Sequence, residues 1–279
     1  MAAASLPMPP GAAMAPPSAQ VMSSSVDFLG TMDGIFMKQQ IEVLEALTGC
    51  ETKNRYHLTP VPQGTPDPTP KEWLNNFKQN AQYQPFMSAK EESECFERIC
   101  CSPFRGFNLP FVDTYGRAFL TVQRPFKCDC CYIPPCYTCT QQEVKVTDAQ
   151  GMTLAIARER SYCCTSCCTR SFDAMDATGN LIYTIQASEC SSSRGCNVFA
   201  PSCCNESYDV DVLDAQGKLI STSSWVFPGC NCAGLTEVTN SVLRFPKNAT
   251  PQQRAALLGG MLLVEYAVIE FRTKKNNNN

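Results

Sequence analysis

Short runs of alternating apolar and polar residues fill the second half of the chain. In one run, Tyr208, Val210 and Val212 alternate with Asp209 and Asp211. This alternation predicts a strand with one buried face and one solvated face. We therefore expect both aspartates on the solvent face, as surface residues rather than as an acid/base pair.

A four-residue turn motif, Asp-x-x-Gly, recurs between these runs. It occurs at Asp113–Gly116, Asp148–Gly151, Asp176–Gly179 and Asp214–Gly217. The aspartate side chain can cap a type I turn, and glycine can adopt the positive φ that closes a hairpin. Four hairpins require at least eight strands, which predicts a mainly β fold with an antiparallel sheet closed into a barrel or folded as a sandwich.

Two segments have helical patterns instead. Between Leu29 and Thr48, apolar residues are mixed with charged ones and Gly49 follows, which predicts a short amphipathic helix ending at Gly49. Near the C-terminus, Thr250-Pro251 is an N-cap followed by proline at the first helical position. We expect a helix of about five turns after this cap.

The C-terminal helix contains an apolar run of 17 residues, interrupted by Glu265 and Glu270. This length is at the lower limit for a bilayer-spanning helix and is also typical of a buried core helix. An ionised Glu265 in lipid would cost roughly 2.5 kcal/mol or more, so burial within protein competes with insertion. The residues that would face lipid or a barrel core are Ala255, Leu257, Leu258, Met261, Leu262, Val264, Glu265, Val268, Ile269 and Phe271.

Composition divides the chain into one large domain with tails. Residues 1–28 are rich in proline and alanine and predict a disordered tail, which is either a spacer or a polyproline ligand for SH3 or WW domains. Residues 29–273 form the domain, and 274–279 form a Lys/Asn tail. Within the domain, we expect a Pro-rich loop insertion near 59–84 that contains one helical turn.

Charge and histidine content exclude several functions. The net charge of −3 provides no basic field for phosphate backbones, so we expect no nucleic-acid partner. A single histidine, His57, removes most Ser-His, Cys-His and His-metal chemistry. We expect His57 to be an ordinary strand residue and the protein not to be an enzyme.

The chain has nineteen cysteines, and its first basic residue is Lys38. A secretory signal would need a basic start before an apolar run, so we expect the cysteines in reducing cytosol, as thiols, thioesters or metal ligands rather than as a disulfide framework. S-acylation, zinc binding and inert packing all remain open for the densest group, which comprises Cys128, Cys130, Cys131, Cys136 and Cys139. A second candidate zinc or thiol cluster comprises Cys163, Cys164, Cys167 and Cys168.

Two blocks of sequence resemble the phospholipid scramblase family. They are QQIEVLEALTGCETKNRY (Gln39 to Tyr56) and RICCSPFRGFNLPFVDTYGRAFLTVQRPFKCDCC (Arg98 to Cys131). The tract ending in CYTCTQQEVKV lies where the family carries palmitoylated cysteines. With the hairpins and the final helix, the resemblance covers about residues 30 to 272.

The resemblance implies a tubby-like fold, in which a barrel of about twelve antiparallel strands surrounds the C-terminal hydrophobic helix. It also implies calcium-stimulated, ATP-independent exchange of phospholipids between leaflets. The expected location is the cytosolic face of a membrane, most simply the plasma membrane, with covalent palmitate as the attached group.

One departure from the family concerns its acidic calcium loop before the last helix. The matching stretch, Leu235 to Thr250, contains one carboxylate, that of Glu237; Thr239, Asn240 and Asn248 supply neutral oxygens. Because affinity for a hard cation follows carboxylate number, we expect a calcium site here to be weak or absent.

Two functional hypotheses follow. In the first, the protein transports lipid; since one helix cannot line a hydrated path for headgroups, an inserted helix would require homo-oligomers. In the second, the protein is an acylated adaptor whose barrel recruits partners. The choice depends partly on whether the helix spans the bilayer or fills the barrel.

Overall fold

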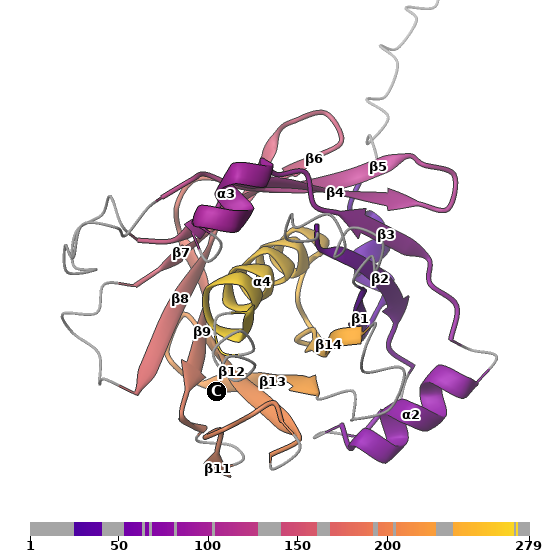
Figure 1. The fold of residues 1–279 in the computed structure, drawn as a ribbon. Helices are drawn as coiled ribbons and strands as arrows, with labels where there is room; N and C mark the ends of the chain where they lie inside the picture. The colour runs from indigo at the N-terminus through magenta and orange to yellow at the C-terminus, as the bar shows by residue number, and fades with distance from the viewer. Residues whose placement is uncertain are drawn as a thin grey trace, which may run out of the picture.

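The computed structural model describes residues 25–40, 53–127, 141–160, 168–226, 237–270 and 272, with short gaps at 63–64, 67–68, 81–82, 102–103, 192–194 and 203–204. Figure 1 shows a barrel seen nearly along its axis, with the C-terminal helix inside. The second part of the helix predicted from the sequence, residues 41–49, lies outside these ranges. Residues 1–24 and 273–279 lie outside them as well.

Twelve antiparallel strands in the described ranges close the barrel, in the order β1-β14-β13-β12-β9-β8-β7-β6-β5-β4-β3-β2. The barrel strands are β1 (Gly34–Gln40), β2 (Arg55–Pro60), β3 (Met87–Lys90), β4 (Phe107–Asp113), β5 (Ala118–Arg124), β6 (Glu143–Asp148), β7 (Thr153–Glu159), β8 (Thr169–Asp176), β9 (Leu181–Ser188), β12 (Ser207–Asp214), β13 (Leu219–Val226) and β14 (Glu237–Arg244). Two further strands, β10 (Cys190–Ser191) and β11 (Gly195–Cys196), form a separate ribbon. The predicted mainly β, closed-barrel architecture is confirmed.

The four predicted Asp-x-x-Gly turns join β4 to β5, β6 to β7, β8 to β9 and β12 to β13. In the first, Asp113 Oδ1 accepts hydrogen bonds from the amides of Tyr115 (2.8 Å) and Arg117 (2.9 Å), and Gly116 has φ +80°. The other three turns repeat this pattern. Aspartate therefore satisfies the turn amides while glycine supplies the left-handed residue.

The C-terminal helix begins at its predicted cap. In α4 (Pro251–Val264), the amide of Gln253 donates to Thr250 Oγ1 (3.3 Å), and the amide of Thr250 donates to Gln253 Oε1 (2.9 Å). Such a capping box satisfies two amides that the helix leaves open. The helix continues as a π-helical turn, η5 (Glu265–Ile269).

Helix α4 is the core of the barrel. All of its residues from Arg254 to Val264 are buried, and it packs mainly against β6 to β9. A Cβ at Gly259 would lie 2.4 Å from Val146 Cγ2, so the glycine lets the helix approach β6 closely. Burial of one leucine side chain stabilises the folded state by roughly 2 kcal/mol. Because the barrel encloses α4, apolar residues on all sides of the helix contribute in this way.

The predicted helix over Leu29–Thr48 is wrong in its first part. Residues Asp27–Thr31 form a short 3-10 helix, η1, and Gly34–Gln40 form β1. Consecutive apolar residues in β1 are buried on both faces: Ile35 belongs to the barrel core and Phe36 to a cluster outside it. A strand buried on both sides loses the polar alternation by which strands are identified.

The tail boundary at residue 28 also differs from the structure. Val26 is fully buried, and Phe28 packs against Phe86 and Phe119. Ser25 Oγ donates to the carbonyl of Phe119 (2.9 Å). Residues 25–28 therefore belong to the folded domain.

The Pro-rich insertion contains α2 (Lys71–Gln79), a nine-residue helix rather than the expected single turn. Its Leu74 and Phe77 cover Phe36, Val226 and Val242 on the outside of the barrel. The helical spacing of Trp73, Leu74 and Phe77 was obscured by the surrounding prolines, which are typical of loops.

Asp209 and Asp211 are buried, contrary to the prediction of a solvent face. Their neighbours Val210 and Val212 face the barrel core, so the aspartates do point outward. Asn197 binds the backbone beside one of them: its Nδ2 donates to the carbonyl of Asp209 (2.7 Å), and its Oδ1 accepts from the amide of Asp209 (3.0 Å). Alternation predicted the direction of the side chains but not their burial.

Candidate functional site

The barrel has two chemically different ends. The four Asp-x-x-Gly turns lie at one end, which we call the turn end. Because the strands run antiparallel, the connections β1–β2, β3–β4, β5–β6, β7–β8, β9–β12 and β13–β14 all leave from the opposite end. Every cysteine of the sequence falls within one of these six connections or at their margins, so we call this the cysteine end.

The candidate acylation sites Cys128, Cys130, Cys131, Cys136 and Cys139 lie outside the described residues, between β5 and β6. The described residues on either side of them, Lys127 and Gln141, are linked, since Lys127 Nζ donates to the carbonyl of Gln141 (3.0 Å). Acylation of this tract therefore remains a prediction.

The zinc cluster is likewise untested as a whole, because Cys163, Cys164 and Cys167 lie outside the described residues. Cys168 is described and exposed, at the start of β8. Within the described part of the chain, no three His, Cys, Asp or Glu side chains gather closely enough to hold a metal ion. Cys95 is disulfide-bonded, whereas the sequence predicted thiols, thioesters or metal ligands rather than a disulfide framework.

The calcium candidates do not converge in one loop. Glu237, Thr239 and Asn240 are in β14, whereas Asn248 follows the far end of that strand. An eight-residue strand spans roughly 25 Å, so Asn248 is distant from Glu237. Asn240 is fully buried, and its partner residue in β1 is Lys38, a cation.

Helix α3 (Cys95–Cys100) places apolar side chains in solvent at the cysteine end. Phe96 is 73% exposed and Ile99 is 56% exposed. They are three positions apart and so share one face of the helix. The residues that line a nearby groove of about 500 Å³ include Glu94, Glu97 and the exposed Phe126.

A second exposed apolar site at this end lies in the β9–β12 connection. Phe199 is 69% exposed, and the adjacent Val198 is 39% exposed. Phe199 also has φ +61°, a conformation that is uncommon for a bulky residue. Exposed aromatic groups are thus found on three separate connections of the cysteine end, with Phe96 on β3–β4, Phe126 on β5–β6 and Phe199 on β9–β12.

A buried charge network holds the helix at the cysteine end. Arg105 donates through Nε to Glu91 Oε1 (2.7 Å) and through Nη1 to Glu270 Oε1 (2.8 Å). Tyr266 OH donates to Glu91 Oε2 (3.2 Å). Although burial alone would raise the pKa of Glu91, the Arg105 guanidinium holds that pKa below its usual range.

Glu265 is also buried, in the π-helical turn, where its carboxylate accepts a hydrogen bond from Trp225 Nε1. Arg170, on β8, donates to the carbonyl of Ala267 and pairs with Glu159 (2.6 Å). Cations near a helix C-terminus are stabilising because of the helix dipole. The acidic residues of the apolar run are therefore accommodated by protein groups.

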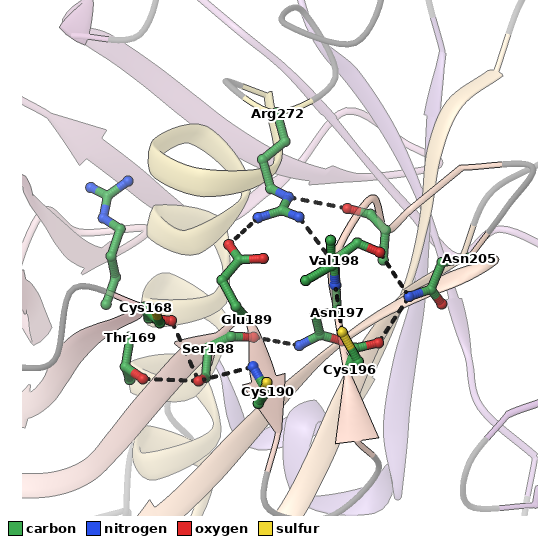
Figure 2. A network of polar contacts seen from close by, with 12 residues as sticks. Cys168, Thr169, Ser188, Glu189, Cys190, Cys196, Asn197, Val198, Asn205 and Arg272 are labelled. Carbon is green, nitrogen blue, oxygen red and sulfur yellow. Dashed lines mark hydrogen bonds and ion pairs between the residues drawn. The ribbon is translucent and has the colours of Figure 1, made fainter.

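Figure 2 shows the network that holds the next turn. Arg272 pairs with Glu189 and donates to the carbonyls of Asn197 (3.0 Å) and Ala200 (3.1 Å). At the turn end, Arg254 donates to the carbonyls of Leu29, in η1, and Met32, which follows it. Arginines fix both ends of the helix.

The structure places the helix candidates Ala255, Leu257, Leu258, Met261, Leu262, Val264, Glu265, Val268 and Ile269 inside the barrel, all buried, whereas Phe271 lies outside the described residues. No helix in the described ranges combines the length and hydropathy needed to cross a bilayer.

His57 is a strand residue as predicted, paired through Nε2 with Gln40 Oε1 at 3.0 Å.

Sequence reasoning missed Glu91, Arg105 and Arg272 as positioning residues. Glu91 and Arg105 stand in a region without periodic signal, and Arg105 and Glu270 are 165 positions apart. A single sequence contains no signal that pairs residues at such a distance.

Comparison with known proteins identifies the family. A protein-family model described as Scramblase matches residues 71–271. Phospholipid scramblase 1 of Homo sapiens is 26% identical over 249 residues, which cover 88% of this chain and 65% of that protein. Phospholipid scramblase family member 5 of Homo sapiens is 31% identical over 126 residues, which cover 45% of this chain and 38% of that protein.

Phospholipid scramblase 2 of Bos taurus is 24% identical over 251 residues, which cover 88% of this chain and 71% of that protein. Among solved structures, a porin-like protein from Bacteroides uniformis aligns with a TM-score of 0.20 and 8% identity, which is too distant to inform the fold. The family model covers well over half of the chain, and this protein therefore belongs to the scramblase family.

Proposed function

We propose that this protein moves phospholipids between the leaflets of a bilayer, in both directions and without ATP, from the cytosolic face of a membrane, most simply the plasma membrane. The observation that carries the proposal is the position of Phe96, Ile99, Phe126 and Phe199. These exposed apolar residues lie at the cysteine end, from which the candidate acylation tract also leaves.

Exposed aromatic residues and acyl chains would act together at this end. Each buried methylene of an acyl chain adds roughly 0.8 kcal/mol of membrane affinity, so one chain binds marginally and two or more anchor. Phe side chains of interfacial segments are buried at the boundary between headgroups and acyl chains. We therefore propose palmitate on Cys128, Cys130, Cys131, Cys136 and Cys139, with the cysteine end against the membrane.

The buried helix constrains how lipid could move. A headgroup needs a hydrated or polar path through hydrocarbon. Helix α4 fills the barrel, with its acidic residues bound to protein groups. The proposal therefore places lipid exchange where the cysteine end contacts and perturbs the bilayer, a contact that a homo-oligomer would enlarge.

Reconstitution into liposomes tests the exchange itself. Vesicles containing a fluorescent phospholipid would be treated with dithionite, which reduces only lipid in the outer leaflet. We expect the protein to make the inner-leaflet fluorescence accessible without ATP, with little added effect of calcium because Glu237 is the one carboxylate of the calcium stretch. Vesicle-bound protein that leaves the inner-leaflet signal protected, with or without calcium, contradicts lipid transport.

Vesicle co-sedimentation tests the orientation. The triple variant Phe96→Ser/Ile99→Ser/Phe199→Ser should lose binding to vesicles of phosphatidylcholine and phosphatidylserine. The matched control is Tyr115→Ser/Met152→Ser, since Tyr115 and Met152 are exposed at the turn end. Equal binding losses in both variants would show that the cysteine end has no special role.

A second candidate function is a lipid-tethered adaptor without transport activity. It is favoured by the burial of α4, which is fixed by Arg254 at one end and by Arg105 at the other. In this reading the proline tail recruits SH3 or WW domains. Replacing the five tract cysteines with serine should then release the protein from membranes, whereas full retention would show that acylation of this tract is not what holds it there.

Zinc is the competing occupant of the thiols. The native mass before and after hydroxylamine treatment distinguishes acylation from zinc binding, because hydroxylamine cleaves thioesters and leaves zinc bound. A loss in multiples of the palmitoyl mass is expected; a zinc mass that a chelator removes would replace acylation with metal binding.

A further inference from the structure

Two cysteines face each other across the small ribbon outside the barrel. Cys190 of β10 pairs directly with Cys196 of β11 in an antiparallel register. Both are exposed free thiols, and Figure 2 shows Cys190 beside Ser188 and Cys196 beside Asn197 within the polar network. They belong to none of the adjacent-cysteine groups that the sequence presents.

Their backbone geometry suits a disulfide. Directly opposed residues in an antiparallel pair have Cα atoms about 4.5 or 5.5 Å apart, depending on the ladder position. Disulfides join residues whose Cα atoms are about 4.4–6.8 Å apart, so either position qualifies without backbone movement. The neighbouring pair is joined between the strands, since the Asn197 amide donates to the carbonyl of Glu189 (2.6 Å). Locally, the Cys190 amide donates to Ser188 Oγ (3.3 Å), and the Val198 amide donates to Cys196 Sγ (3.4 Å).

We propose that Cys190 and Cys196 form a reversible disulfide, with glutathione disulfide as the oxidant. One thiolate attacks a sulfur of glutathione disulfide, forming a mixed disulfide and releasing one glutathione. The facing thiolate then attacks the protein sulfur and releases the second glutathione. The protein loses two electrons and two protons, which the two glutathione molecules receive, and excess glutathione reverses both steps.

The disulfide would act on the network that holds the C-terminal helix. Glu189 directly precedes Cys190, and Asn197 directly follows Cys196; both bind Arg272. Asn197 Nδ2 also donates to the carbonyl of Ser188 (2.6 Å). A covalent bond between the two cysteines fixes the spacing of the Arg272 acceptors, so oxidation strengthens the attachment of the end of the helix.

This inference is independent of the proposed function, because it concerns thiol chemistry and not lipid. Reduced protein would be equilibrated in glutathione buffers of graded redox poise, quenched in acid, alkylated with N-ethylmaleimide and digested with trypsin. Since Arg194 lies between the two cysteines, cleavage leaves two peptides joined only by the disulfide. We expect this linked mass, localised to Cys190 and Cys196 by fragmentation, to rise with oxidation and disappear on return to reducing buffer.

Matched variants make the result decisive. Cys196→Ser should abolish the linked mass, and Cys100→Ser, at another exposed free thiol, should retain it. Amide exchange in the peptide beginning at Gly195 should be slower in oxidised protein than in reduced protein, and the difference should vanish in Cys196→Ser. Full alkylation of both thiols in every buffer, or linkage of Cys190 to a different cysteine, would overturn the proposal.

Discussion

The indole Nε1 of Trp225, on β13, donates a hydrogen bond to the buried carboxylate of Glu265, on the C-terminal helix. The contact joins the wall of the barrel to its core at the point where α4 becomes a π-helical turn. A carboxylate that would be costly in lipid is thus satisfied inside the protein.

The first prediction concerns this contact. Trp225→Phe removes the donor and keeps most of the ring, so it should lower the free energy of unfolding by about 1–3 kcal/mol, since it withdraws a donor from a buried carboxylate. Glu265→Gln, which keeps an acceptor oxygen for the indole, should cost less. Urea denaturation of both variants gives the comparison; a greater loss for Glu265→Gln would mean that Trp225 is not its main partner.

The buried ion pair of Arg105 supports a second prediction. Arg105→Met leaves Glu91 buried without its guanidinium, which should destabilise the fold by about 3–5 kcal/mol. Adding Glu91→Gln to this variant should restore part of the loss, because the uncompensated charge disappears. A double-mutant cycle measured by urea denaturation checks the coupling, and strictly additive losses would argue against it.

The third prediction is a dependence of stability on acid. Because the pKa of Glu91 is lower in the folded protein than its ordinary value of 4.5, folding is favoured above that value and the contribution is lost as the pH falls through the lower folded pKa. Unfolding free energies measured between pH 7 and pH 3 should decrease less steeply for Glu91→Gln than for the unmodified protein. Parallel curves would assign the acid sensitivity to other carboxylates.

Adjacent glycines in α4 give a fourth prediction: replacement by alanine should destabilise the protein more at Gly259 than at Gly260. A Cβ at Gly259 meets Val146 Cγ2, and one at Gly260 meets Ile185 Cδ1, each at 2.4 Å. The Val146 methyl lies on a stiff β-branched side chain, whereas the end of Ile185 can rotate away. Gly259→Ala should therefore cost about 1–3 kcal/mol, as in other overpacked cores.

Gly260→Ala is the matched control. Its milder contact is offset by the gain in helix propensity of about 1 kcal/mol for alanine over glycine, so the net change should be small. Thermal unfolding of the two variants would rank them, and equal melting temperatures would contradict close packing of α4 against β6.

The sequence alone determined the elements whose causes are local. Each Asp-x-x-Gly turn contains its own hydrogen-bond acceptor and its own left-handed residue, and Thr250 and Gln253 cap α4 within four positions. From these signals, hairpins, a barrel and the start of the helix could be predicted without knowledge of distant contacts.

Tertiary structure decided the remainder, because burial depends on what closes over a residue. Phe36 is buried on the outer face of β1 only because the Pro-rich segment covers it, and this cover removed the strand signal. Asp209 alternates with residues of the barrel core and yet is buried, although its position in the strand predicted solvent exposure. The pairing of Arg105 with Glu270 required the barrel to form, because 165 positions separate the two residues. The opposition of Cys190 to Cys196 depends on the register of the β10–β11 ribbon, which the spacing of the two cysteines alone does not determine.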